Sequence, residues 1–213
     1  MSVERYRYLL FYARSGAMTW VAHLDMMRTF ERALLRAAIP VAWSGGFNPR
    51  PDLVFALPVG VGVETRHEPF QLTLTEAVKP EALVNALNAV LPPGLIIREA
   101  VVDSSVGSIM ARVTAATYTI VGAGVASLVP ALQATAPLNV EKHSKKGLRT
   151  VDLRPGIIAF QFNGEDALQI SVRAGSNDNV RLDLLLDALS VNVAKTTFNW
   201  READLIRTEV VLN

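Results

Sequence analysis

Three arginines at helical spacing are the first residues of this sequence that suit a defined chemistry. Arg28, Arg32 and Arg36 follow one another at intervals of four, which puts them on one face of a helix. Asp25 lies on the same face, three residues before Arg28. A guanidinium is a fork of donors that matches a phosphate, so three in a row can follow a nucleic-acid backbone. A solvated helix face with an Asp25–Arg28 ion pair explains the same spacing, and both interpretations stay open.

His23 begins the same segment and is the one candidate for acid–base chemistry. A histidine can act as a general acid or base near neutral pH, or donate to a phosphate. The alternative is a structural histidine bonded to a loop carbonyl. His67 and His143 stand alone, and the absence of cysteine excludes a thiolate zinc site, a cysteine-ligated cluster and a cysteine nucleophile. The sequence therefore predicts no metal and no cofactor, and it favours a protein that is not an enzyme.

A loop at residues 44–51 is the second candidate, because it combines two glycines, two prolines and an aromatic residue. Glycines allow positive φ and expose backbone N–H groups, so such a loop can hold an anion. Phe47 can stack a base, with Ser44, Asn48 and Arg50 as polar partners. The segment lacks the Lys-Ser/Thr of a phosphate-binding P-loop and fits no dinucleotide fingerprint. The alternative is a specific turn between two strands.

Two further segments are cationic. Residues 142–149 form a predicted hairpin tip with four cations and no acid, namely Lys142, Lys145, Lys146 and Arg149. A cationic β-ribbon can grip a phosphate backbone, and the alternative is a soluble turn. Residues 173–181 place Arg173, Ser176 and Arg181 around a loop before a predicted helix, where N–H groups can receive an anion. Asp178 or Asn179 capping that helix is the alternative.

The spacing of apolar residues predicts an α+β protein of two similar halves. The first half reads β-α-β-β-α-β, and the second repeats that order around the basic turn. The predicted strands are residues 5–12, 41–43, 69–75, 95–102, 118–121, 138–140, 150–153, 156–162, 167–173 and 205–212, and the predicted helices are residues 22–38, 79–90, 125–134 and 180–189. We predict two tandem ferredoxin-like units with antiparallel sheets, residues 1–103 and 104–213, joined at the small polar segment 103–108.

Composition predicts a protein with a substantial core and an anionic partner. Half of the 213 residues are apolar. No apolar stretch approaches the roughly 20 residues that span a bilayer, and no signal peptide is evident, so we expect a cytoplasmic protein with no membrane contact. Residues 1–50 carry seven Arg against three acidic residues, and since the net charge is +1, the remainder carries −3. This asymmetry favours nucleic acid as a partner, or a solubilising surface.

Three motifs together resemble one family: residues 23–28 (His-Leu-Asp-Met-Met-Arg), 46–49 (Gly-Phe-Asn-Pro) and 57–60 (Leu-Pro-Val-Gly). The chain resembles the bacterial radical-SAM-linked proteins, a domain of unknown function found alone or joined to a radical S-adenosylmethionine protein. Residues 141–155 and 173–181 extend the resemblance over nearly the whole chain. The family's loop usually carries a His and a Lys where this chain has Arg50 and Asp52, so a role for that His is not carried over, whereas anion contact is kept by Arg50.

The resemblance implies an accessory or substrate-presenting role beside a radical-SAM protein, without a named reaction. Together with the cationic segments, it leads us to expect a non-catalytic RNA-binding accessory protein. A metal-independent endoribonuclease that uses His23 is one alternative. A protein-interaction module for a radical-SAM partner is the other.

Overall fold

The computed structural model describes residues 4–144, 147–176, 178–193 and 196–213. The chain divides into two compact units. Unit 1 consists of the residues up to Val113 together with Arg207–Asn213, and unit 2 of Thr114–Ile206. Unit 1 therefore continues past the expected boundary at residue 103 and takes in the end of the last strand as well.

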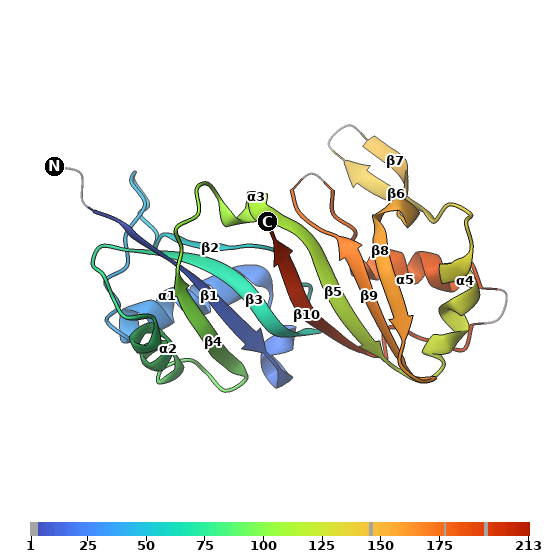
Figure 1. Ribbon diagram of the computed structural model, residues 1–213, viewed down its shortest axis with the longest axis horizontal. Coiled ribbons are helices and arrows are strands. Elements are labelled where there is room, and N and C mark those ends of the chain that lie inside the picture. Colours follow the sequence, from blue (N-terminus) through green and yellow to red (C-terminus); the bar gives the residue numbers. More distant parts are fainter. Residues whose placement is uncertain (1–3, 145–146, 177, 194–195) are drawn as a thin grey trace. The chain divides into compact units, whose positions relative to one another are not determined.

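Unit 1 has the predicted order β-α-β-β-α-β (Figure 1). Its elements are β1 (Tyr6–Arg14), the 3-10 helix η1 (Gly16–Trp20), α1 (His23–Arg36), β2 (Leu53–Phe55), β3 (Val63–Leu74), α2 (Pro80–Asn88), β4 (Leu95–Val102), the short α3 (Ile109–Arg112) and the second part of β10 (Asp204–Leu212). Strands β3 and β4 flank β1, and β2 pairs with β3, all of them antiparallel. The result is an antiparallel sheet with helices that follow its first and third strands.

Two strands of unit 1 differ from the prediction. Residues 41–43 form only isolated bridges, Val41 to Leu74 and Trp43 to Pro51, so the strand predicted there is wrong. The strand is instead β2, where Leu53 and Phe55 are buried against β3. Strand β3 also begins at Val63 rather than at residue 69. Its first half is polar in sequence, which conceals a strand whose Thr65 and Glu68 are buried by tertiary contacts.

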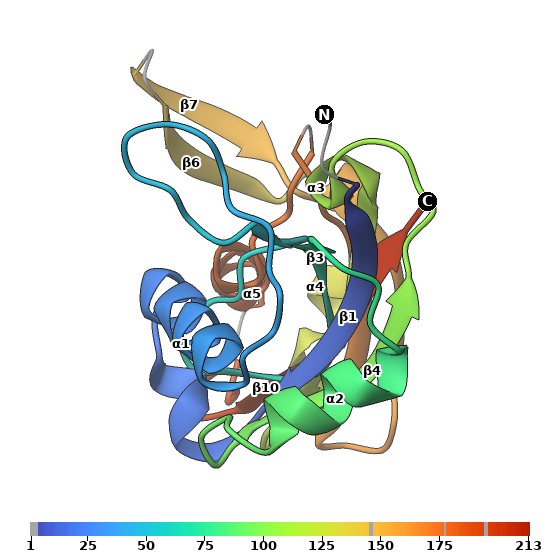
Figure 2. The same ribbon diagram turned by 90° about the vertical axis from the view of Figure 1, so that its left-hand side faces the viewer.

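The core of unit 1 is an aromatic cluster between the helices and the sheet. Phe30 from α1 contacts Phe55 and Phe70, with ring centroids 5.3 and 5.1 Å away, and Tyr12 lies 5.2 Å from Phe30. Such edge-to-face pairs add about 0.5–1.5 kcal/mol each to the burial of their area. Leu83 and Leu87 of α2 complete the same cluster, and both helices are visible near β1 in Figure 2. Because the face of α1 that carries Phe30 is buried in this cluster, the opposite face of the helix is exposed to solvent.

Unit 2 contains a group of three antiparallel strands and a separate two-stranded ribbon. Its elements are β5 (Val113–Val121, of which Val113 belongs to unit 1), the 3-10 helix η2 (Val125–Leu128), α4 (Val129–Gln133), β6 (Asn139–Ser144), β7 (Gly147–Asp152), the 3-10 helix η3 (Arg154–Gly156), β8 (Ile157–Phe162), β9 (Ala167–Arg173) and α5 (Leu182–Val191). Strands β5 and β8 flank β9. The hairpin predicted across Asn163-Gly164 is confirmed, since β8 and β9 pair antiparallel.

Strands β6 and β7 pair only with each other, as a two-stranded ribbon (Figure 1). Both strands are longer than predicted and contain most of the basic turn. Helix α5 buries Leu185, Leu186 and Leu189. In the described residues, no helix is long and apolar enough to cross a membrane.

Candidate functional site

The exposed face of α1 and the loop at residues 44–51 form the first candidate site, named here the α1–loop surface. Helix α1 is strongly amphipathic, with Met26, Phe30 and Leu34 buried. Arg28 and Arg32 are exposed on the other face. The Arg28 Nη1 atom lies 2.9 Å from Asp25 Oδ1, so the predicted ion pair is present. Because both partners are exposed, this pair contributes little to stability.

The other two arginines of the row differ in their contacts. Arg36 donates from Nη2 to the carbonyl oxygen of Val90 at 2.8 Å, which ties the end of α1 to the turn after α2. Arg32 is exposed, and within the described part of the chain no acceptor contacts it. Of the row, Arg32 is therefore the guanidinium most available to an external anion, and Arg28 comes next, since only one exposed carboxylate occupies it.

The loop at residues 44–51 is closed at its neck by hydrogen bonds. Ser44 N donates to the carbonyl of Arg50 at 2.8 Å, and Arg50 N donates to Ser44 Oγ at 3.0 Å. Gly46 adopts φ +105°, a conformation that glycine tolerates and other residues rarely adopt. At the tip, Phe47 has an exposed fraction of 106% and Asn48 is exposed too. The loop thus presents an aromatic ring to solvent above a fixed neck.

Arg50 connects this loop to α1. Its Nη1 atom lies 4.0 Å from Glu31 Oε1, and its side chain is 68% exposed. This approach joins the loop that carries Phe47 to the helix that carries Arg28 and Arg32.

His23 does not share that face. It precedes Arg32 by nine residues, which is two and a half turns of an α-helix, so the two side chains point in opposite directions. The His23 ring packs edge-on against Phe55 at 5.7 Å. Burial and the nearby charge of Arg14 lower the pKa of His23. His23 is therefore a neutral, partly buried residue near pH 7, with no carboxylate or hydroxyl bonded to it among the described residues.

Three buried charged residues, which sequence reasoning missed, hold the motif at residues 57–60. Glu68 accepts from Arg207 Nε at 2.6 Å and from Nη2, and both side chains are only 2% exposed. Arg207 also donates to the carbonyls of Leu57 and Pro58 at 3.0 and 3.1 Å. Arg14 donates to the carbonyl of Gly60, and to that of Val63 at 3.0 Å. The Leu-Pro-Val-Gly motif is thus positioned by its backbone, which indicates a structural role.

The pKa directions around this cluster follow from burial. Burial lowers the pKa of the Arg14 guanidinium. Burial, and then the charge of Glu68, raise the pKa of the Tyr12 hydroxyl. Arg14 directly follows an apolar run in β1, residues 8–13, and this is the signal from which the sequence could have suggested a buried charge. Arg207 lies in a strand with other charged residues, Asp204 and Glu209, and gives no such signal.

In unit 2, the ribbon β6–β7 and the loop at residues 173–181 form a second candidate site, named here the ribbon–loop surface. Lys142 Nζ donates to the carbonyl of Asn179 at 3.3 Å, so these two predicted segments do meet. Arg149 lies opposite Lys142 in the ribbon register and is exposed. Lys145 and Lys146 lie outside the described residues.

The arginines of the loop are paired with carboxylates. Arg173 Nη1 lies 3.3 Å from Asp178 Oδ2, and Arg181 Nε lies 3.1 Å from Asp183 Oδ1. The N-cap of α5 is Arg181, without a side-chain cap, so neither Asp178 nor Asn179 caps this helix. Ser176 is exposed. The most available cations of the ribbon–loop surface are therefore on the ribbon rather than on the loop.

No metal centre emerges from the described residues, since they contain no group of three His, Asp or Glu placed to hold an ion. The α1–loop surface belongs to unit 1 and the ribbon–loop surface to unit 2. Chemically, the α1–loop surface offers guanidinium donors and an exposed aromatic ring, and the ribbon–loop surface offers guanidinium and ammonium donors.

Comparisons with known proteins give one informative match. A family model described as an uncharacterized protein conserved in bacteria (DUF2344) matches residues 7–182. No curated protein matches the chain. Among solved structures, a chain of a Cbf5–Nop10–Gar1 complex is 9% identical with a TM-score of 0.48; the match covers 95% of this chain and 48% of that one, so this chain spans about half of it. An unknown protein from Galdieria sulphuraria is 15% identical with a TM-score of 0.29, over 99% of each chain. Neither structural likeness is close enough to indicate a function.

Proposed function

We propose that this chain, which belongs to the DUF2344 family of uncharacterized proteins conserved in bacteria, is an accessory protein that binds single-stranded RNA on its α1–loop surface. The observation that carries the proposal is the full exposure of Phe47 at the tip of a loop with a closed neck. Covering a large, solvent-exposed aromatic ring with a ligand lowers the free energy of the system. Stacking on a nucleic-acid base is worth about 1–3 kcal/mol per base.

Arginines of α1 and of the loop supply the phosphate contacts. Arg28 and Arg32 are about 6 Å apart along the axis of α1, so they can reach neighbouring phosphates of one strand. Arg50 is part of the loop, and its guanidinium approaches Glu31 of α1. An aromatic platform next to a cationic track is the usual arrangement for binding single strands with little sequence preference. Lys142 and Arg149 of the ribbon–loop surface offer a second set of phosphate contacts.

A fluorescence anisotropy titration with labelled oligouridine tests the proposal. We expect Phe47→Ala to weaken binding by about fivefold to a hundredfold, since it removes one stacked base. The matched control is Trp20→Ala, which removes another aromatic ring of unit 1 that is 71% exposed but lies outside the α1–loop surface. Equal affinities of the two variants would contradict the proposed role of Phe47.

The salt dependence of the same titration tests the phosphate contacts. Each contact to a single strand contributes about 0.7 to the slope of log K against log salt. Arg32→Gln should therefore reduce the slope by about that amount, and Arg36→Gln, at an arginine already bonded to Val90, should reduce it less. Absence of binding at low salt, or binding that does not change with salt, would refute RNA binding.

A protein-interaction role is the second candidate, and two exposed leucines favour it. Leu24 and Leu35 of α1 are 65% and 58% exposed. With Arg28 they share the solvent face of the helix, which gives a mixed apolar and cationic strip. The radical-SAM partner remains a prediction from the resemblance. If a radical-SAM protein stays bound in a pull-down after RNase treatment, and Leu24→Ser with Leu35→Ser releases it, this strip is a protein interface.

The endoribonuclease alternative has less support, because His23 faces Phe55 and, among the residues that the structure describes, no second acid or base is bonded to it. We expect His23→Ala to leave RNA binding unchanged. Loss of an RNA-cleaving activity in that variant would favour the enzyme instead.

The order of the strands supports a ferredoxin-like description of both units. In unit 1, the sequence β-α-β-β-α-β combines with the spatial order β4-β1-β3-β2. In unit 2, α4 follows β5 and α5 follows β9, with β9 between β5 and β8 and with the ribbon β6–β7 inserted before β8. We propose on this basis a tandem of two ferredoxin-like units, with the ribbon as an insertion that carries the cationic turn.

A further inference from the structure

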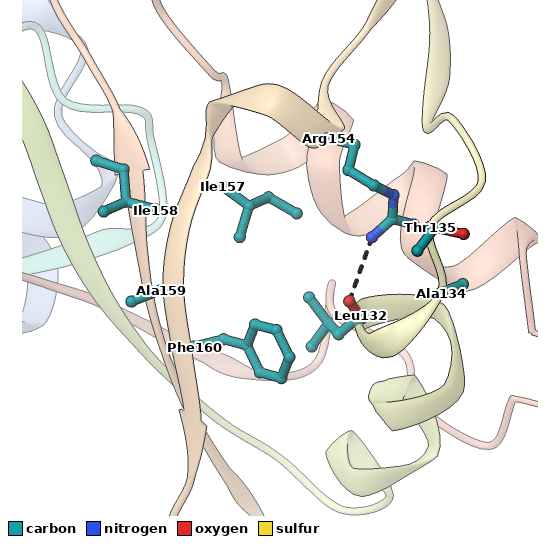
Figure 3. Close-up of a pocket in the computed structure, with 8 residues that line it drawn as sticks. All are labelled: Leu132, Ala134, Thr135, Arg154, Ile157, Ile158, Ala159 and Phe160. Atoms are coloured by element: carbon teal, nitrogen blue, oxygen red, sulfur yellow. Dashed lines mark hydrogen bonds between the residues drawn. The ribbon is translucent and has the colours of Figure 1, made fainter.

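Unit 2 has a pocket beside the edge of its sheet. The pocket has a volume of about 550 Å³, within the range of ligand-binding sites. It lies between β8 and the end of α4. Ile157 and Phe160 of β8 point into it toward Leu132 of α4, and Arg154 lies at one end (Figure 3). Apart from Arg154 and Thr135, the side chains that line it are apolar.

Strand β8, which forms one wall, is an open edge. It pairs with β9 on one side and is the last strand in the sheet order. In the described part of the chain, the outer backbone groups of β8 have no strand partner. Natural edge strands are normally protected by charged residues, by proline or by a covering segment. The sequence of β8, Ile-Ile-Ala-Phe-Gln-Phe, contains neither charge nor proline, and Ile158 and Phe160 are 55% and 37% exposed.

Arg154 places a positive charge at one end of the pocket. Its guanidinium donates to the carbonyls of Ala131, Leu132 and Ala136 at 2.8, 3.2 and 2.5 Å, which completes the end of α4. An arginine has five N–H donors, so two remain without an acceptor in the described residues. Arg154 is also the only charged side chain among those that line the pocket. The pocket is therefore apolar along β8 and cationic at one end.

We infer that this pocket binds an extended peptide segment of a partner protein, added to β8 as a further strand, with a carboxylate of the peptide at Arg154. The open edge of β8, the apolar pocket and Arg154 would each contact a different part of the peptide. The open edge offers main-chain hydrogen bonds, and the pocket takes every second side chain of the peptide, as in other complexes formed by strand addition. The two remaining donors of Arg154 match a carboxylate, either a chain terminus or an acidic side chain. This inference is independent of RNA binding by unit 1.

The test uses the full chain and a panel of heptapeptides that alternate Thr with Val, Ile, Leu or Phe and end in a free carboxylate. A matched panel carries a C-terminal amide. We expect at least one acid peptide to bind by isothermal titration calorimetry at a concentration below about 1 mM, and its amide to bind about tenfold more weakly.

Two protein variants locate the binding. Ala134 lines the pocket, is exposed and has an extended backbone that accepts any side chain, so Ala134→Trp should fill the pocket and weaken binding at least tenfold. Gln133→Trp is the matched control, because Gln133 is exposed next to it but does not line the pocket. Thermal unfolding of both variants establishes that the fold is kept.

Several results would overturn the inference. They are the failure of every acid peptide to bind, equal binding to the Ala134→Trp and Gln133→Trp variants, and equal binding of acid and amide peptides, which would remove the role of Arg154. A dimer in sedimentation analysis that Ala134→Trp alone dissociates would identify a second copy of this chain as the occupant in place of a peptide.

Discussion

The buried Glu68–Arg207 pair gives the most direct test of how unit 1 is held together. Glu68→Gln keeps the size of the side chain but removes its charge, and it places an amide N–H₂ against a guanidinium that also only donates. Both side chains are 2% exposed, so water cannot replace the lost partner. Breaking a buried pair by removing one charge costs about 3–5 kcal/mol. That is a large share of the about 5–15 kcal/mol by which domains are stable.

The bonds of Arg207 to the backbone make a second variant informative. A well-packed apolar replacement of both partners is often neutral for stability. Here, however, Glu68→Met with Arg207→Met would also leave the carbonyls of Leu57 and Pro58 without this donor. Each such loss costs about 1–3 kcal/mol. We therefore expect the double variant to remain at least about 2 kcal/mol less stable than the parent, although more stable than Glu68→Gln.

Urea unfolding followed by tryptophan fluorescence measures these differences, and hydrogen exchange of the β1 and β3 amides assigns them to unit 1. The control is Asp183→Asn, which breaks an exposed pair with Arg181 and should cost less than about 1 kcal/mol. A loss below about 1 kcal/mol for Glu68→Gln would refute the reasoning. Full recovery of stability in the double methionine variant would refute the structural role assigned to the motif at residues 57–60.

Three further predictions concern single residues. The folded-state pKa of His23 lies below its ordinary 6.5 because of burial and the charge of Arg14. The contribution of His23 to stability is therefore present above pH 6.5 and is lost as the pH falls. The free energy of unfolding of His23→Gln should fall less between about pH 7.5 and pH 5.5 than that of the parent. For Asp103, burial acts to raise the pKa, but hydrogen bonds from Ser105 and Gln71 and the charge of Arg112 outweigh it and hold the pKa below 3.8. Its contribution is thus present above that pH and lost below it, and the parent and Asp103→Asn should approach each other in stability when urea unfolding is compared at about pH 5 and pH 3. Gly94→Ala should lower the free energy of unfolding in urea by at least about 2 kcal/mol, because Gly94 has φ +89° and an added Cβ would lie 2.6 Å from the Ser15 carbonyl oxygen. The control is Gly45→Ala, which should cost little because Gly45 has open space around it and no positive φ. Equal effects of the two changes would contradict this account.

Local patterns in the sequence were sufficient for most of the elements. Helix α1 was predicted at residues 22–38 and runs from His23 to Arg36, because its apolar residues recur with helical period and Pro40 follows. Strand β4 was predicted with its observed bounds, Leu95–Val102. The β8–β9 hairpin followed from Asn163-Gly164, whose backbone preference is a property of those two residues. The exposed arginine row of α1 was predictable for the same reason, since it is the complement of the buried face.

Only the tertiary structure decided which polar residues are buried and which candidates meet. Glu68 and Arg207 are 139 positions apart in the sequence, and no local pattern signals that these two side chains share one site. The polar start of β3 is a strand because β1 pairs with it, and β2 lies after the loop because Leu53 and Phe55 match β3 in register. His23 was a candidate in the same helix as the arginines; helical spacing places it opposite Arg32, and only the tertiary structure brings Phe55 against its ring. Periodicity and turn chemistry are local, but burial depends on which distant segments pack together, and that determines whether a charged residue faces solvent or the core.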